Sequence, residues 1–375
     1  MKSIWYIYHS TRGSAGAYMH RLLLASQEAG LKSIAFVSTQ YKFDSPGAIR
    51  FFFPFTENTE KRNLLINIIR ALEYTVNLGF IWLGASLLRP IIHLQLTEST
   101  LPTYIFFRLC RLTRLKIVTT CHDVIEHSGE VPYRRKNILI NSHLLVVHNH
   151  NAESVLTGLL PETRNRIFIY PFPFADAKPI LTEAGMTSAE QKLKVLTDGR
   201  KWLLFTGYVR ESKGIALLYE AWKRGGFSED TALMIAGKWQ AGLQDLKEEL
   251  KDCRNTFILD RRLTDEELHY CISNSFFVVY PYLNYSHSGI FYSCVYSGGV
   301  PLLSDIELFG EMAPEYPFTF RSGDIADLVL SLHKCLRTTV EERDEARNYL
   351  LKRIEKGMGT IPFRLEEMKK YLKFN

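Results

Sequence analysis

The chain has 375 residues, of which 46% are hydrophobic and 23% are charged. This composition excludes a disordered or fibrous protein and leaves two or three domains with enough apolar residues for cores of their own. The charge is uneven: residues 1–175 hold 19 Lys and Arg against 11 Asp and Glu, a net +8, whereas residues 176–375 hold 27 against 29, a net −2. A basic first half suits a membrane surface or a phosphate-bearing ligand better than a neutral partner.

Targeting and redox signals are weak. The six cysteines show no CxxC spacing and several lie in apolar runs, which predicts reduced thiols and not a disulfide framework or a zinc site. The N-terminus has five apolar residues before polar ones return, too few for a signal peptide. The run Tyr74–Leu88, 15 residues long, is shorter than a membrane span. We expect no transmembrane helix.

Strands and helices alternate through the first half. The first strand, Ile4–Tyr8, leads into a loop with Gly13 and Gly16, and a helical pattern follows. Small residues before a helix let the backbone approach a phosphate, although a tight turn without a ligand fits as well. Further apolar runs predict strands at 33–38, 49–53, 91–96, 116–123, 144–149 and 167–174, with helices from about residue 60, over 104–112 and through 155.

Residues 175–200 lack a strong apolar period and are predicted to be a linker. The alternation then restarts, with strands at 202–206, 233–236, 256–259, 276–280, 301–304 and 317–320 and helices over 244–250, after Thr264, from Ile290 and from Ile325. Thr264 and Glu267 form a capping-box pattern. This alternation predicts an α/β protein made of two Rossmann-like domains, residues 1–174 and 201–359, that face each other across a cleft, and a C-terminal helix at about 360–375 is expected to pack back on the first.

Polar residues follow several of the predicted strands. Because ligands of parallel sheets bind beyond the carboxyl ends of the strands, His93 and the pair His122–Asp123 are candidates in the first half. Each has a structural alternative. Either histidine fits a hydrogen-bonded strand-end residue without a further role, and Asp123 fits a cap of the next segment.

The stretch WLLFTGYVRESKGIALLYEAW, residues 202–222, joins a strand, a turn and a helix. Gly207 opens the turn, and Arg210 and Lys213 precede the helix. Cations beside the free N–H groups of a helix start form an anion site. The alternative is an ordinary connection with surface charges.

A second loop has similar character. Ser286–Gly289 lies between a strand and the helix from Ile290, and Gly237 ends another strand of this half. Two helix starts with two cations favour a diphosphate, and therefore a nucleotide-linked substrate. The chain has no Asp-x-Asp, so neither a metal nor another cofactor is expected, and cations with helix dipoles would neutralise the diphosphate instead.

These motifs resemble a known family in their order along the chain. FTGYVRESKGIALLYEAW, LMIAGK, FILDRRLTDEEL and FVVYPYLNYSHSGIFYSCVYSGGVPLLSD are similar to motifs of GT-B glycosyltransferases of family 4, as are the glycine loop, CHD at 121–123, VVHNHNAESVL and IYPFPF of the first half. The resemblance covers most of both halves. It implies retaining transfer of a sugar from a nucleotide sugar without a metal.

The resemblance also implies roles. Arg210 and Lys213 would hold the donor diphosphate and stabilise the leaving group, His122 would lie near the reacting sugar, and Gly16 would approach the phosphates. The residues expected to bind the donor are Gly13, Gly16, Gly207, Arg210, Lys213, Gly237, Ser286, His287, Ser288, Gly289 and Cys294.

The chain departs from the family pattern at three places. Ser286 and Cys294 occupy the positions of two glutamates that usually contact the sugar and the ribose. Tyr208 stands where the arginine is more usual. The resemblance therefore does not name the sugar or the base.

The sequence thus predicts a cytoplasmic, hexosyltransferase-like enzyme, peripheral at the inner face of a bacterial membrane and acting in surface polysaccharide biosynthesis. Its expected partners are a nucleotide sugar, a glycan or lipid-linked glycan acceptor and an anionic membrane, and no nucleic acid. The alternatives are a nucleotide-sugar epimerase and a non-catalytic nucleotide- or glycan-binding homologue. Membrane docking is expected through Leu64–Leu88 and its flanking Lys61, Arg62, Arg70 and Arg89; a buried pair of helices is the competing prediction.

Overall fold

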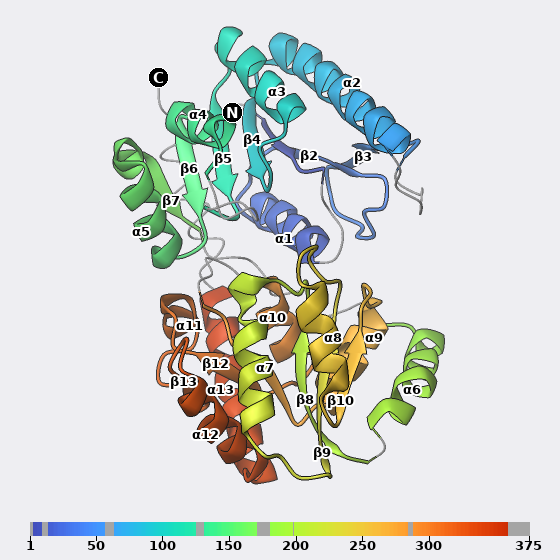
Figure 1. The fold of residues 1–375 in the computed structure, drawn as a ribbon. Coiled ribbons are helices and arrows are strands. Elements are labelled where there is room, and N and C mark those ends of the chain that lie inside the picture. The colour runs from blue at the N-terminus through green and yellow to red at the C-terminus, as the bar shows by residue number, and fades with distance from the viewer. Residues whose placement is uncertain are drawn as a thin grey trace. The chain divides into compact units, whose positions relative to one another are not determined.

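The computed structural model describes residues 3–9, 14–56, 64–124, 131–170, 181–197, 199–283 and 288–358. The chain divides into two compact units, the first running to Asp176 and the second from Ala177 to Glu355. Each unit is a parallel sheet covered by helices (Figure 1). The two predicted α/β domains are therefore present.

The first unit contains a seven-stranded parallel sheet in the order β3-β2-β1-β4-β5-β6-β7. Its strands are short apolar runs that are mostly buried on both faces, as parallel sheets require. The order reverses at β1, which pairs with both β2 and β4. The strands are β1 (Ile4–Ile7), β2 (Ser33–Ser38), β3 (Ala48–Phe52), β4 (Ile91–Leu96), β5 (Ile117–Cys121), β6 (Leu144–Val147) and β7 (Ile167–Ile169).

Helices cover this sheet. They are α1 (Ser14–Glu28), α2 (Leu64–Leu88), α3 (Leu101–Leu112), α4 (Tyr133–Asn141) and α5 (His150–Leu159), with the 3-10 turn η1 (Pro161–Arg166). The helix α4 was not predicted, and its Arg135 is fully buried, donating to the carbonyl oxygens of Thr97, Asp123 and Val124. A cation in the interior breaks the apolar period from which helices are predicted, which explains the omission.

The helix α2 packs on the first unit through one face only. It packs on α3 and β3, and Tyr74, Leu78, Ile81 and Ala85 belong to the core. Only 22% of its most apolar 18-residue window is buried, and it is the one helix among the described residues that is long and apolar enough to cross a membrane. The prediction of a buried pair of helices at this place is wrong, because α2 is a single helix with a largely exposed outer face.

The second unit contains a six-stranded parallel sheet in the order β10-β9-β8-β11-β12-β13. The order reverses at β8, which pairs with β9 and β11, so the carboxyl end of β8 lies at the switch point where such sheets bind ligands. The strands are β8 (Lys201–Thr206), β9 (Thr231–Ala236), β10 (Thr256–Leu259), β11 (Phe277–Tyr280), β12 (Pro301–Ser304) and β13 (Thr319–Phe320).

The helices of the second unit are α6 (Glu183–Thr197), α7 (Ile215–Arg224), α8 (Gln244–Asp252), α9 (Asp265–Asn274), α10 (Gly289–Tyr296), α11 (Glu307–Met312), α12 (Ile325–Leu336) and α13 (Val340–Met358), with the 3-10 turn η2 (Glu211–Lys213). The capping box of α9 is confirmed: Thr264 accepts from the Glu267 N–H and the Glu267 side chain accepts from the Thr264 N–H.

Much of the predicted linker 175–200 is the helix α6. This helix packs on α9 through the buried Ala189 and Leu193, and Thr182 donates to the Glu266 carboxylate. The helix also contains Gly185 and several polar residues, which weaken the apolar period by which a helix is recognised in a sequence. The prediction of a C-terminal helix at 360–375 falls outside the described residues.

Candidate functional site

The basic turn after β8 draws two long cations into the second unit. Arg210 is 7% and Lys213 is 5% exposed, although both belong to a connection between a strand and a helix. The single 3-10 turn η2 and the left-handed Gly214 direct the Lys213 side chain back toward the end of β8. The Lys213 ammonium lies 5.3 Å from the centre of the Tyr282 ring. Two cations held at the end of a strand and before a helix start are suited to bind an anion.

Two glycines permit close approaches around this ammonium. A Cβ added to Gly207 would lie 3.0 Å from Lys213 Nζ and 3.7 Å from Ile290 in the first turn of α10. A Cβ added to Gly237, at the end of β9, would overlap the Gly207 carbonyl oxygen. The structure therefore brings Gly207, Lys213, Gly237 and the start of α10 together at the carboxyl ends of β8 and β9.

The start of α10 completes this group. Ser288 is the N-cap residue, it is buried, and Gly289 is the first helical residue. Burial raises the pKa of the Tyr282 hydroxyl, and the Ser288 hydroxyl and the charge of Arg210 oppose that shift, which places both beside Tyr282. We name Gly207, Arg210, Lys213, Gly237, Ser288 and Gly289 the basic-turn site.

The backbone of the basic turn depends on Gly214. Its φ is +68°, and an added Cβ would overlap the Pro281 carbonyl oxygen. We expect Gly214→Ala to destabilise the protein by about 3 kcal/mol or more, because left-handed strain adds to a backbone clash that cannot relax. Urea unfolding followed by circular dichroism measures this.

Gly226→Ala is the matched control. Its φ is +58°, but nothing lies within 4 Å of an added Cβ. This variant should lose only about 1 kcal/mol, the cost of left-handed backbone alone. Equal losses in the two variants would contradict a close packing of the turn against Pro281.

Other predicted donor residues lie elsewhere. Cys294 lies on the buried face of α10, next to Gly299 and Tyr280, and burial raises the pKa of its thiol to about 12. The structure therefore places Cys294 in the core and not in the basic-turn site. Gly13, Ser286 and His287 fall outside the described residues.

The first unit gathers histidines and tyrosines at the carboxyl ends of its strands. His122 follows β5, and its Nε2 lies 3.0 Å from Gln95 Oε1 of β4. Its Nδ1 lies 3.1 Å from His148 Nε2, beyond β6. The Tyr8 ring, beyond β1, stacks on His122 with centroids 5.3 Å apart. Gly16 is buried in the first turn of α1.

His93 has the structural role that was the alternative prediction. Its Nε2 pairs with Thr120 Oγ1 at 2.7 Å within the sheet. Burial lowers the pKa of His93 to about 3, and the neighbouring His148 contributes to this shift. Sequence reasoning did not single out Gln95 or His148. A signal was present, because Gln95 interrupts the run IIHLQL and His148 follows the run LLVV, as His122 follows β5.

Several solved structures resemble this chain over nearly its whole length. They include HepE of Anabaena in complex with UDP and glucose (TM-score 0.70, 11% identity, 99% of this chain and 100% of that one) and a UDP-forming trehalose-phosphate synthase of Burkholderia xenovorans (0.69, 12%, 100% and 99%). Trehalose-6-phosphate synthase OtsA matches with a TM-score of 0.67, 13% identity and coverage of 100% and 99%. No family model matches the sequence, and no curated protein does.

The chain has the GT-B fold. The GT-B part of the predicted resemblance is thereby confirmed, whereas these structures do not single out glycosyltransferase family 4. In GT-B terms, the basic-turn site lies in the C-terminal unit and the His122 group in the N-terminal unit.

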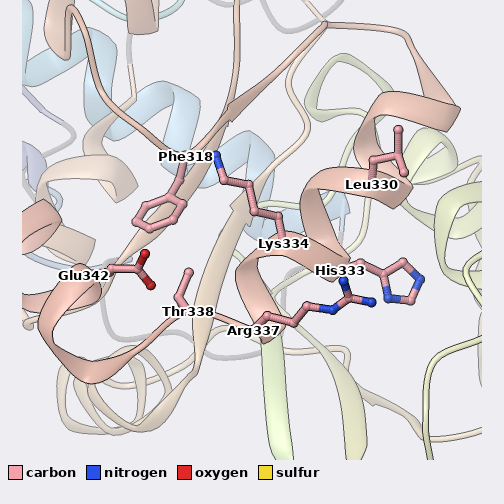
Figure 2. A pocket seen from close by; sticks show the side chains of 7 residues that line it. All are labelled: Phe318, Leu330, His333, Lys334, Arg337, Thr338 and Glu342. Carbon is pink, nitrogen blue, oxygen red and sulfur yellow. The ribbon is translucent and has the colours of Figure 1, made fainter.

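The C-terminal GT-B unit also has an open pocket whose lining includes no residue of the basic-turn site. It is lined by residues of the segment before β13, of α12, of the connection between α12 and α13 and of the start of α13: Phe318, Leu330, His333, Lys334, Arg337, Thr338 and Glu342 (Figure 2). Phe318 precedes β13, and Lys201, at the beginning of β8, donates to the Leu336 carbonyl nearby. This pocket therefore opens at the amino ends of the strands, opposite to the edge where parallel sheets bind ligands.

Proposed function

We propose that the chain is a retaining glycosyltransferase that moves a sugar from a nucleotide-sugar donor to a glycan acceptor. The observation that carries the proposal is the basic-turn site: two buried cations, Arg210 and Lys213, converge with two glycines and a helix start at the switch point of a sheet. The GT-B neighbours add support, since HepE was solved with UDP and with UDP-glucose, and OtsA is a trehalose-6-phosphate synthase.

The chemistry of the site suits departure of a nucleoside diphosphate. When the bond from the sugar to the diphosphate breaks, negative charge grows on the leaving oxygen. Lys213 and Arg210 would stabilise that charge, and the free N–H groups at the start of α10 would add fixed dipoles. Gly207 and Gly237 lack side chains where the phosphates would approach Lys213. The retaining outcome rests on the family resemblance.

Nucleotide release tests the proposal against its alternatives. The protein is mixed with UDP-, GDP- and ADP-sugars, and free nucleotide is measured beside the melting temperature. A transferase should be stabilised by one donor and release its nucleotide slowly into water. A binding homologue would be stabilised without release, since ligand binding to the native state alone raises the melting temperature. An epimerase would change the sugar and release no nucleotide.

Transfer should not require a divalent metal. The chain has no Asp-x-Asp, and the described residues hold no group of three or more His, Cys, Asp or Glu side chains that could bind a metal ion. We expect nucleotide release to change by less than about twofold in excess EDTA, because Lys213 and Arg210 supply the positive charge. Loss of release in EDTA, restored by magnesium, would contradict this.

The proposed acceptor is a lipid-linked glycan, in keeping with a cytoplasmic enzyme of bacterial surface polysaccharide synthesis that docks on the membrane. The outer face of α2 supports docking. Seven of its exposed residues fall within an arc of about 80° at 100° per residue, opposite the buried face. We name this set the α2 stripe: Leu65, Ile69, Leu72, Val76, Phe80, Leu83 and Leu87.

The charge around the α2 stripe supports an anionic membrane as its proposed partner. Residues 64–116 hold six Lys and Arg against two Asp and Glu, a net +4. Arg108 and Arg111 are exposed on α3, which packs beside α2 (Figure 1). An apolar stripe beside cations is the pattern of helices that lie in the plane of an anionic membrane surface. The buried face of α2 belongs to the core, so a helix crossing the bilayer would have to leave the sheet.

Three of the cations that the sequence predicted for membrane docking are replaced in this proposal. The Arg70 guanidinium lies 3.7 Å from the centre of the Phe53 ring and donates to Thr56, so it belongs to the packing of α2 on the unit. Lys61 and Arg62 fall outside the described residues. The exposed arginines of α3 take their place.

A further inference from the structure

Four groups form a continuous hydrogen-bonded row across the carboxyl ends of β4 to β7. Gln95 contacts His122 Nε2, His122 Nδ1 contacts His148 Nε2 at 3.1 Å, and His148 Nδ1 contacts the Tyr170 carbonyl oxygen at 2.9 Å. All four residues are buried. Since each contact needs one donor and one acceptor, the row has a defined direction.

The direction follows from its fixed end. The Tyr170 carbonyl oxygen only accepts, so His148 Nδ1 carries a hydrogen. Burial lowers the pKa of His148 to about 4, so the ring is neutral near pH 7 and its Nε2 is an acceptor. His122 Nδ1 must then donate to it. In a neutral His122 ring, this leaves Nε2 with a lone pair.

Gln95 agrees with this assignment once its amide is turned. The two ends of an amide have the same shape, and their assignment follows from the hydrogen bonds they make. As drawn, Gln95 Nε2 is buried without a partner among the described residues, whereas Oε1 faces a nitrogen that has no hydrogen to give. Turning the amide lets Gln95 Nε2 donate to His122 Nε2.

We propose that His148 is a positioning residue that holds His122 as the Nδ1–H tautomer, so that His122 Nε2 is a hydrogen-bond acceptor for which Gln95 and a hydroxyl group of a bound ligand compete. The contact between His122 and a ligand hydroxyl rests on the proposed function, whereas the tautomer of His122 does not. Two tyrosines beside the His122 ring are compatible with a neutral imidazole. Tyr8 stacks on it, Tyr18 meets it edge-on at 4.9 Å, and burial raises the pKa of both hydroxyls.

The adjacent carboxylate is the charged group to consider. Asp123 follows His122 in the chain. Burial of Tyr8 raises the pKa of its hydroxyl, and the charge of Asp123 raises it further. Asp123 therefore lies near enough to act on this cluster through its charge. The measurement is accordingly made at pH 7.5 and repeated at pH 6.

Nitrogen NMR on protein labelled with ¹⁵N-histidine, without any nucleotide sugar, tests the tautomer. We expect the His122 signals to show a protonated Nδ1 and an unprotonated Nε2 at pH 7.5, with His122→Gln identifying them. His148→Leu removes the acceptor, so the ring should return to the Nε2–H form and donate to Gln95. His148→Gln offers an amide oxygen in place of Nε2 and should keep the Nδ1–H form.

The two His148 variants are matched, since both lose the bond to the Tyr170 carbonyl. An Nε2–H or doubly protonated His122 in the wild type, or an unchanged tautomer in a folded His148→Leu variant, would overturn the proposal. If the protein transfers sugar, His148→Leu should also lower turnover about tenfold, the value of one hydrogen bond, and His148→Gln should not. If the protein has no transferase activity, the NMR measurement still decides whether His148 sets the tautomer of His122.

Discussion

Lys213→Ala and Arg210→Ala are each expected to lower the rate of nucleotide release by about 100- to 1000-fold. Removing one preorganised donor from a developing oxyanion costs about 3–4 kcal/mol of barrier, and both cations lie at the predicted leaving group. The melting temperature of each variant has to be measured beside its activity, because both cations are buried in the unit. Release of nucleotide at saturating donor measures the effect, with the melting temperature as a check on folding.

Lys238→Ala is the control for charge alone. Lys238 follows Gly237 at the same edge of the sheet, but its side chain is 65% exposed and its ammonium lies 3.8 Å from Asp260. An exposed ion pair contributes little, so this variant should change release by less than about twofold. Arg210→Lys adds a second comparison, since it keeps the charge and loses the fork that binds two oxygens. Near wild-type release from both alanine variants would place the donor site elsewhere.

The fold could be predicted in detail because its strands are apolar runs bounded by polar turns. The predicted strands 33–38, 91–96, 256–259 and 301–304 match β2, β4, β10 and β12 at both ends. Buried parallel strands carry this signal in every residue. The helices α4 and α6 were missed for the opposite reason, since each buries only a few residues and one of them is the cation of Arg135.

The candidate site was predictable where its residues are contiguous. Arg210, Lys213 and Gly207 lie within one turn, and their convergence follows from a strand that feeds a helix. The row from Gln95 to Tyr170 was not predictable, because it joins the ends of four strands and depends on which side chains the sheet order brings together. Cys294 shows the same limit, since its position in the motif did not reveal that its side chain points into the core.

The protein is expected to sediment with anionic vesicles, and substitution of the α2 stripe should abolish that binding. In the variant Leu72→Gln/Val76→Gln/Leu83→Gln, each change removes an exposed apolar side chain that would insert into the membrane surface. Each insertion is worth about 1 kcal/mol, part of the value for full burial, so the partition coefficient should fall about 150-fold. None of the three contributes to the core, so the melting temperature should stay the same.

The matched control replaces exposed apolar residues away from α2. Leu159→Gln/Leu330→Gln/Val340→Gln changes side chains of similar type and exposure on α5, α12 and α13, and it should leave vesicle binding unchanged. Arg108→Gln/Arg111→Gln tests the electrostatic part. It should weaken binding about 30-fold at low salt and much less at high salt, because each cation near the surface contributes about 1 kcal/mol within a Debye length.

Three outcomes would contradict docking through the α2 stripe. Equal sedimentation with neutral and anionic vesicles would show that the arginines do not contribute to binding. No sedimentation with either kind of vesicle would show that the protein does not bind membranes. If analytical ultracentrifugation showed that the wild-type protein is a dimer and the stripe variant a monomer, the stripe would be an interface between two copies of the chain. Alkaline carbonate separates the remaining case. Alkaline carbonate releases a protein whose helix lies in the plane of the membrane surface, whereas a protein with a helix that spans the bilayer stays bound. Because Tyr74, Leu78 and Ile81 hold α2 in the core, we expect the protein to be released.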